Sequence, residues 1–314
     1  MMDFSFVIQQ IVNGFSLGSM YALIAIGYTL VYGVLRLINF AHGDIMMVGA
    51  FLTFIFVGML TNWTFTNITM PIFLTACGLS IFFTSLVGVM TYVVAYKPLL
   101  DKDAPKISLL ITAIGISFFL ESLFNVISNQ FFGGNYQSFY FPKWFSQIIH
   151  IGNVTIPILT IIVPIMTLLL LGVVLFILYK TKVGIAIRAL AFDIQTVKLM
   201  GANSNKIIAF VFALGSALAA IGGISYAMAY PSIDPYMGIL VGLKAFAAAV
   251  VGGIGSVTGA VIGGFILGFV EVAIPGFFPE LGGWKDAFAF ILLIFVLLFK
   301  PTGIMGIDFE RQRF

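Results

Sequence analysis

Three ionisable side chains, Glu121, Lys244 and Glu271, lie deep within apolar runs. A charge inside a membrane is costly and is usually paired. Counted from the outer ends of their predicted helices at about 1.5 Å per residue, all three sit at depths of up to roughly 10 Å and can meet. We expect a structural pair of Lys244 with Glu271 or Glu121, with direct substrate contact as the alternative. Proton coupling has thin support, because no relay of further acids or histidines accompanies them.

A second polar cluster, Arg36, Asn39, His42 and Asp44, separates two apolar runs in the segment GVLRLINFAHGDIMMVGAF. Such a segment is either a short loop at the membrane surface or a broken helix that lines a cavity. The spacing of His42 and Asp44 suits metal ligands poorly, and no third ligand is nearby, so we predict no metal site. We expect these side chains to satisfy backbone groups where the helix breaks.

The glycine-rich run VGGIGSVTG, residues 251–259, resembles a phosphate loop only superficially, because it lacks the Lys-Ser/Thr ending and a βαβ context. We predict a turn between two short or half-length helices, with Ser256 as N-cap. The backbone N–H groups of Gly253, Gly255 and Ser256 would then face a carboxylate on a translocation path. Neither HExxH nor GxSxG occurs, so no catalytic residue is predicted and a membrane enzyme is disfavoured.

The stretch 180–206 is the one long polar interruption in the apolar second half of the chain, with five basic residues against the single acid Asp193. We predict a helix over Ile185 to Met200, ended by a left-handed Gly201 and followed by capping residues for the next span. One face of this helix is an apolar stripe that packs on the membrane domain: Ile187, Leu190, Ile194 and Val197. The opposite face carries Arg188, Phe192, Gln195 and Leu199.

This second face has two interpretations. Phe192 and Leu199 either dip into lipid from an interfacial helix or fill a groove on a cytoplasmic partner, with Arg188 fixing the register.

Composition places these elements in a membrane. Of 314 residues, 61% are hydrophobic and 9% charged, against roughly 25% charged in soluble domains. We predict an all-α polytopic integral membrane protein with a single domain, residues 1–314, whose first apolar run is a retained span. Gly14 and Gly18 in that run allow close helix approach. The count is seven crossings if the pair in 236–273 is re-entrant and nine if it crosses twice.

Basic residues set the expected orientation. Three loops, 97–106, 180–206 and the C-terminal tail, hold eleven of the fifteen Lys and Arg residues. By the positive-inside rule these loops face the cytoplasm, which places the N-terminus outside and the C-terminus inside. A net charge of only +3, concentrated in these loops, argues for membrane orientation and against nucleic-acid binding. A weak inverted repeat is suggested by the polar breaks before the small-residue-rich runs that start at His42 and Ile254.

Three segments carry a family resemblance: GYTLVYGVLRLINFAHGDIMMVGAF, VGIAIRALAFDIQTVKLMGANSNKIIAFVFALGSALAAIGGI and AFAAAVVGGIGSVTGAVIGGFILG. In this order they resemble permease subunits of bacterial ABC importers of the branched-chain amino acid class, over nearly the whole chain. In the wider class the coupling loop reads Glu-Ala-Ala, three residues, then Gly. Here Gln195, Thr196 and Val197 precede Gly201, so a salt bridge of that Glu is not carried over.

The resemblance implies a translocation subunit of the cytoplasmic (inner) membrane, without a cofactor or nucleotide site of its own. Its implied partners are cytoplasmic ATP-binding subunits on the 185–201 helix, a second homologous permease or a second copy, a periplasmic or surface substrate-binding protein, and membrane lipid. Two alternatives stay open. One is a stand-alone secondary transporter or channel for a small polar solute, and the other is an ABC permease for urea or short amides.

Overall fold

The computed structural model describes residues 4–193, 197, 199–201 and 203–306. Within these residues, eight helices are long and apolar enough to cross a membrane, and a ninth apolar helix, Met237–Gly252, is shorter. This confirms an all-α polytopic membrane protein. The helices are α1 (Phe4–Leu35), α2 (His42–Leu60), α3 (Met70–Met90), α4 (Lys97–Leu100), α5 (Lys106–Phe132), α6 (Ile158–Lys180), α7 (Lys182–Phe192), α9 (Ser204–Ala229), α10 (Met237–Gly252), α11 (Val257–Phe277) and α12 (Lys285–Phe299).

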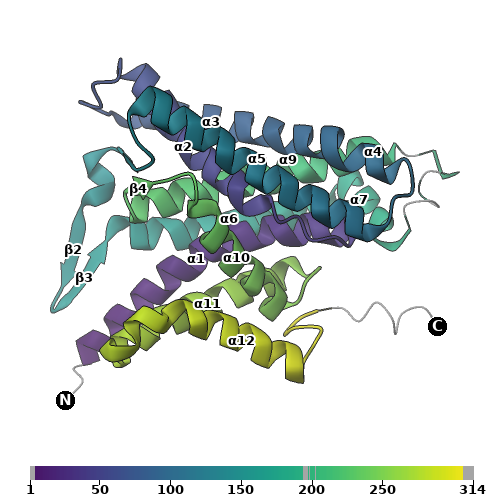
Figure 1. Cartoon of the computed structure of the whole chain (residues 1–314). Coiled ribbons are helices and arrows are strands. Elements are labelled where there is room, and N and C mark those ends of the chain that lie inside the picture. The colour runs from purple at the N-terminus through teal and green to yellow at the C-terminus, as the bar shows by residue number, and fades with distance from the viewer. Residues whose placement is uncertain (1–3, 194–196, 198, 202, 307–314) are drawn as a thin grey trace.

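The shorter elements connect these helices. A π-helical turn, η1 (Thr91–Tyr96), joins α3 to α4, and two 3₁₀ turns are η2 (Lys143–Ser146) and η3 (Pro279–Trp284). Strands β2 (Ile148–Ile151) and β3 (Val154–Pro157) form an antiparallel hairpin, and β1 (Gln137–Ser138) pairs with β4 (Ser232–Ile233). All four strands lie at the end of the bundle opposite α7 (Figure 1).

Helix α1 is the central element of the bundle. Its central residues are almost completely buried, and it packs against α6, α9, α10 and α11. Gly14 and Gly18 of α1 meet α11, where an added side chain at Gly268 would collide with the backbone of Gly18. Helices approach this closely only where small residues face each other, so the predicted role of Gly14 and Gly18 is confirmed.

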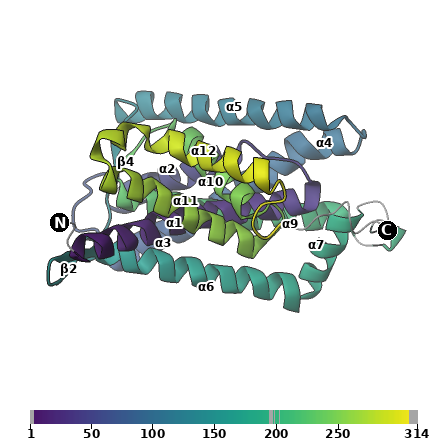
Figure 2. The same ribbon diagram turned by 90° about the horizontal axis from the view of Figure 1, so that it is seen from below.

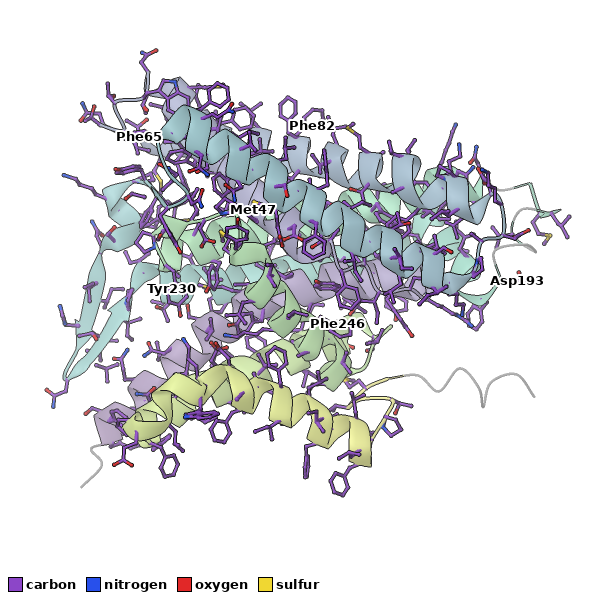
Figure 3. All side chains as sticks on the ribbon, in the orientation of Figure 1. Met47, Phe65, Phe82, Asp193, Tyr230 and Phe246 are labelled. Carbon is purple, nitrogen blue, oxygen red and sulfur yellow. The ribbon has the colours of Figure 1, made fainter. Side chains whose placement is uncertain are left out.

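The outer surface is apolar. Helices α3, α5, α6 and α12 present large exposed side chains along their lengths, among them Phe82, Phe118, Leu169 and Leu298. Figure 3 shows Phe82 pointing away from the helices, whereas Met47 of α2 lies in the interior. An apolar belt around a buried core fits contact with lipid tails.

The helix directions fix which segments share an end. The start of α1 lies at one end of the bundle, and α7 and the chain after α12 lie at the other (Figures 1 and 2). Counting α10, the described chain makes nine passes between these two ends. Helix α10 has 16 residues, but α11 has 21, so only the first of the two predicted half-length helices is short.

The two polar breaks lie at the same end of the bundle. Arg36 contacts Ala191 of α7, and Gly255 and Ser256 border a groove beside Ala191. Both α2 and α11 therefore leave their breaks in the same direction, away from α7. These two segments form a parallel pair, and the inverted relationship suggested for them is not found.

Candidate functional site

Helix α7 folds back tightly on the end of α6. The hydroxyl of Thr181 accepts a hydrogen bond from the backbone N–H of Gly184 at 3.1 Å and so caps α7. A side chain at Gly184 would collide with the carbonyl oxygens of Ile177 and Leu178. Glycine at this position is therefore what allows the sharp elbow between the two helices.

The predicted two faces of the 185–201 segment are visible in burial. Ile187 and Leu190 are 4% and 1% exposed, and Val197 is buried as well. On the other side Phe192 is 67% exposed and Leu199 is 87% exposed. Ile194 and Gln195 lie outside the described residues. Two large apolar side chains therefore point away from the bundle at this end.

The continuous helix predicted over Ile185 to Met200 is wrong. Helix α7 ends at Phe192, and Asp193 is extended, with φ −155° and ψ 111°. The basic side chain of Arg36 donates to the carbonyl oxygen of Ala191 at 2.8 Å, which satisfies one of the terminal carbonyls of α7. This contact comes from a distant part of the chain, so helix periodicity within the segment carried no sign of it.

The predicted end of this segment agrees with the structure in its local geometry. Gly201 has φ +82°, the left-handed conformation that favours glycine. Asn203 caps α9 by accepting a hydrogen bond from the N–H of Lys206 at 3.2 Å. Arg188 lies over the ring of Tyr179 with 5.0 Å between guanidinium carbon and ring centroid, so it stacks on the end of α6.

The linker 36–41 returns the chain into the bundle before α2 begins. A side chain at Gly27, two turns before the end of α1, would collide with the ring of His42. The start of α2 is therefore inset by about 12 Å from the end of α1, at 1.5 Å per residue. Asn39 accepts hydrogen bonds from the N–H of Ala41 at 3.2 Å and from the hydroxyl of Tyr96 at 3.0 Å. The Asn39 side chain thus satisfies a backbone donor where the helix breaks and ties the linker to η1.

The glycine-rich turn between α10 and α11 lies beside α7. Gly253 and Gly255 have φ +111° and +95°, and the Ser256 hydroxyl accepts from the N–H of Gly259 at 3.1 Å, so the predicted N-cap is present. The segment after α12 closes the end of α10, where the N–H of Ile304 donates to Val251 at 2.9 Å. A groove of about 280 Å³ separates this turn from α1, α6 and α7. The turn and Arg188 therefore line the same groove.

The buried charges divide into two groups on opposite faces of α10. The Lys244 ammonium lies 2.6 Å from Glu271 Oε1 and 2.6 Å from Asp286 Oδ1. Tyr21 of α1 donates to the second oxygen of Glu271 at 2.8 Å. This cluster joins α1, α10, α11 and α12, and the pairing of Lys244 with Glu271 is as predicted.

Glu121 does not meet Lys244, so of the two partners expected for Lys244 only Glu271 pairs with it. Gly238, Ile239, Gly242 and Leu243 of α10 line a cavity shared with Glu121. At 100° per residue, Lys244 lies about 170° around the helix from the middle of these four positions. Instead Glu121 shares this cavity of about 190 Å³ with Asp44 of α2. Depth along a helix was predictable; the direction each side chain faces depended on how α10 is rotated in the bundle.

The structure adds polar residues to both groups that sequence reasoning missed. Tyr21 and Asp286 join the Lys244 cluster, and Ser117 donates a hydrogen bond to Asp44 Oδ2. Tyr21 and Ser117 are polar residues within apolar spans, so the sequence alone could have marked both as candidates for buried polar contacts. Asp286 stands at the start of the last apolar run of the sequence, and its position next to a buried lysine requires the packing of α12 on α10.

A polar cavity of about 480 Å³ lies at the end opposite α7, between the first half of α1 and the ends of α9 and α11. Gln10, Asn13, Tyr230, Glu271 and Lys285 contribute to its lining. Figure 3 shows Tyr230 at this end of the bundle. The described helices therefore enclose one polar cavity toward this end and a smaller acidic cavity deeper in the bundle. Polar cavities within an apolar helical bundle are typical of membrane proteins that bind or conduct polar solutes.

Comparison with known proteins makes this class specific. The family described as branched-chain amino acid transport system permease component matches residues 10–297. The high-affinity branched-chain amino acid transport system permease protein BraD of Pseudomonas aeruginosa is 41% identical over 95% of each chain. LivH of Escherichia coli, a permease of the same description, is 39% identical over 97% of each chain. A probable branched-chain amino acid transport permease of Methanocaldococcus jannaschii is 29% identical over 94% of this chain and 91% of its own.

The chain belongs to the family of branched-chain amino acid transport system permease components. The resemblance in three sequence segments is thereby confirmed across the bundle, from α1 to α12.

Proposed function

We propose that this chain is the translocation subunit of an ABC importer that moves branched-chain amino acids across the bacterial cytoplasmic membrane. The observation that carries the proposal is the similarity to BraD and LivH over the full length of the bundle. Substrate would pass between the helices, and the energy of ATP hydrolysis would come from partner subunits. The stand-alone transporter and the urea or amide permease are not favoured by these relatives.

The ATP-binding subunits dock, in this proposal, on α7 and the residues up to Gly201. Phe192 and Leu199 supply exposed apolar contacts there, and Arg188, held on Tyr179, lies beside the same surface. Gln195 would join this surface. Most basic side chains of the described residues also belong to loops at this end, which the positive-inside rule assigns to the cytoplasm. Phe4 would then lie on the outer side and Gly306 on the cytoplasmic side.

Two further partners complete the proposed importer. A second homologous permease, or a second copy of this chain, would pair with it in the membrane. A periplasmic or surface substrate-binding protein would deliver the amino acid to the end that carries β1 to β4, above the polar cavity of Gln10, Asn13 and Glu271.

Reconstitution in proteoliposomes tests this function. The chain is incorporated with its ATP-binding subunits and second permease, and radiolabelled leucine is supplied with the binding protein. Uptake should require ATP and all partners. Leucine uptake by this chain alone, driven by an ion gradient, would contradict the proposal, and uptake of urea in place of leucine would replace its substrate class.

A further inference from the structure

The cavity shared by Asp44 and Glu121 has the composition of a site for an ammonium group. It is a half-open cavity of about 190 Å³ between α1, α2, α5 and α10, and Phe118, which is 62% exposed, stands at its open side. Asp44 is 1% exposed and Glu121 is 5% exposed. Among the described residues, no lysine, arginine or histidine lines this cavity. Two buried carboxyl groups therefore line one cavity that has no basic side chain in its described lining.

The hydrogen bonding of these carboxyl groups is incomplete. Ser117 donates to Asp44 Oδ2, but Asp44 Oδ1 has no hydrogen-bond partner among the described residues. This oxygen faces Gly238, which lines the cavity, because an added side chain carbon at Gly238 would lie 2.6 Å from it. Glu121 forms no ion pair with any described residue. Buried polar atoms are normally paired, and an unpaired one points to a missing ligand.

Apart from Ser117 and Tyr28 of α1, the rest of the lining carries no polar side chain, and the cavity is small. This remaining lining comprises Phe40, Ile114, Phe118, Ile239 and Leu243, together with Gly238 and Gly242. Pockets for drug-sized ligands begin at about 300 Å³, so this cavity suits a smaller molecule. A ligand that satisfies this lining carries a positive charge at one end and an aliphatic group at the other.

We propose that this cavity binds the transported amino acid within the membrane domain, with its ammonium group between Asp44 and Glu121 and its branched side chain against the apolar wall. The assignment rests on the proposed function for the class of substrate. The ammonium group supplies the charge-assisted hydrogen bonds that the two carboxylates lack. The cavity lies on the opposite face of α10 from the Lys244 cluster, so occupation leaves that structural ion pair undisturbed.

The first test uses the complete importer in proteoliposomes with saturating binding protein and leucine. Glu121→Gln and Asp44→Asn remove one charge each, Glu121→Asp retains it, and Glu280→Gln removes an exposed acid of η3 as the matched control. We expect Glu121→Gln and Asp44→Asn to lower leucine uptake about tenfold, the effect of losing one charged hydrogen bond. ATP hydrolysis stimulated by the loaded binding protein should stay within about twofold of the parent, because docking and assembly are intact. Glu121→Asp should recover part of the uptake and Glu280→Gln all of it.

The second test measures the charge preference and the occupancy of the cavity by thiol labelling, without measuring transport. Ile239→Cys in a Cys77→Ser background places one thiol in the lining, because Cys77 is the chain's single native cysteine. A cationic methanethiosulfonate should label it several times faster than an anionic one, and leucine should slow the labelling. Adding Glu121→Gln should reduce both the charge preference and the protection.

The outcomes separate this proposal from the function itself. If the parent importer transports no leucine, the proposed function fails, whatever the labelling shows. If the parent transports and Glu121→Gln transports equally well, the cavity is not the binding site. Loss of uptake, ATP hydrolysis and partner assembly in both Glu121→Gln and Glu121→Asp would instead assign Glu121 a structural role and overturn the proposal.

Discussion

Arg36, in the linker between α1 and α2, donates a hydrogen bond to the carbonyl oxygen of Ala191 at the end of α7, over 2.8 Å. The same linker leads within six residues to the first turn of α2, where Asp44 lines the acidic cavity. Arg36 therefore connects the proposed docking helix directly to a wall of the cavity. Asn39, bonded to Tyr96, holds the middle of this connection.

This connection predicts loss of coupling when it is removed. Arg36→Ala should weaken the contact between the linker and α7 by about 1.5–3 kcal/mol, the range for hydrogen bonds to charged groups. We expect the ratio of ATP hydrolysed to leucine transported to rise several-fold in proteoliposomes. Lys143→Ala, an exposed basic residue of η2 at the other end, is the control and should leave the ratio unchanged. An unchanged ratio for Arg36→Ala would show that α7 transmits its movement by another route.

Phe192 and Leu199 should carry the docking of the ATP-binding subunits. Replacing either residue with Asp puts a charge into the apolar groove of the partner. Loss of a central apolar contact weakens the binding free energy by about 2 kcal/mol or more. We expect co-purification of the ATP-binding subunits and leucine uptake to fall together, by at least about tenfold. Tyr136→Asp, 77% exposed at the opposite end, makes the same kind of change and should leave both intact. Retained co-purification in both single variants would favour the interpretation of an interfacial helix in lipid.

Loss of the buried Lys244 should lower the stability of the protein more than loss of Lys285, the exposed lysine at the edge of the same cluster. Lys244→Met leaves the carboxylates of Glu271 and Asp286 without their cation, and breaking a buried pair costs about 3–5 kcal/mol. We expect a large drop in the melting temperature of the detergent-solubilised protein. Lys285→Met is the control, since Lys285 is 45% exposed and 3.8 Å from Glu271. Its expected effect is at most about 1 kcal/mol. Equal melting temperatures for the two variants would contradict this account.

Close packing of α1 on α11 should fail when a side chain is inserted. Gly268→Val adds carbons where the backbone of Gly18 already lies, and overpacking costs about 1–3 kcal/mol or more. We expect reduced yield of monodisperse protein by size-exclusion chromatography. Gly115→Val, on α5, is the matched control because an added side chain carbon there meets nothing within 4 Å. Comparable losses at both positions would show that the effect arises from helix propensity alone.

The class of protein and several local features were predictable because they depend on neighbours in the chain. Apolar run lengths gave the spans, and small residues at Gly14 and Gly18 marked a helix contact. The caps at Asn203 and Ser256 and the left-handed Gly201 follow from side-chain and backbone chemistry over a few residues. The burial of Ile187 and Leu190 against the exposure of Phe192 follows from helical period within α7.

The errors have a common origin in contacts between distant segments. Helix α7 stops at Phe192 where Arg36 reaches its terminal carbonyl, 155 residues away in sequence. Glu121 was expected near Lys244 because both lie at similar depth. The rotation of α10 about its axis instead separates them, and depth alone contains no information about that rotation.

By itself, the sequence determined that this chain is a membrane protein, which segments are apolar enough to span and which loops carry the basic residues, because hydropathy and charge act on each segment independently. Only the tertiary structure decided which buried charges meet. Lys244 pairs with Glu271 and Asp286, whereas Glu121 lines a cavity together with Asp44. The physical reason is that the rotation and packing of whole helices decide which side chains share a space, and no single segment of the sequence contains that information.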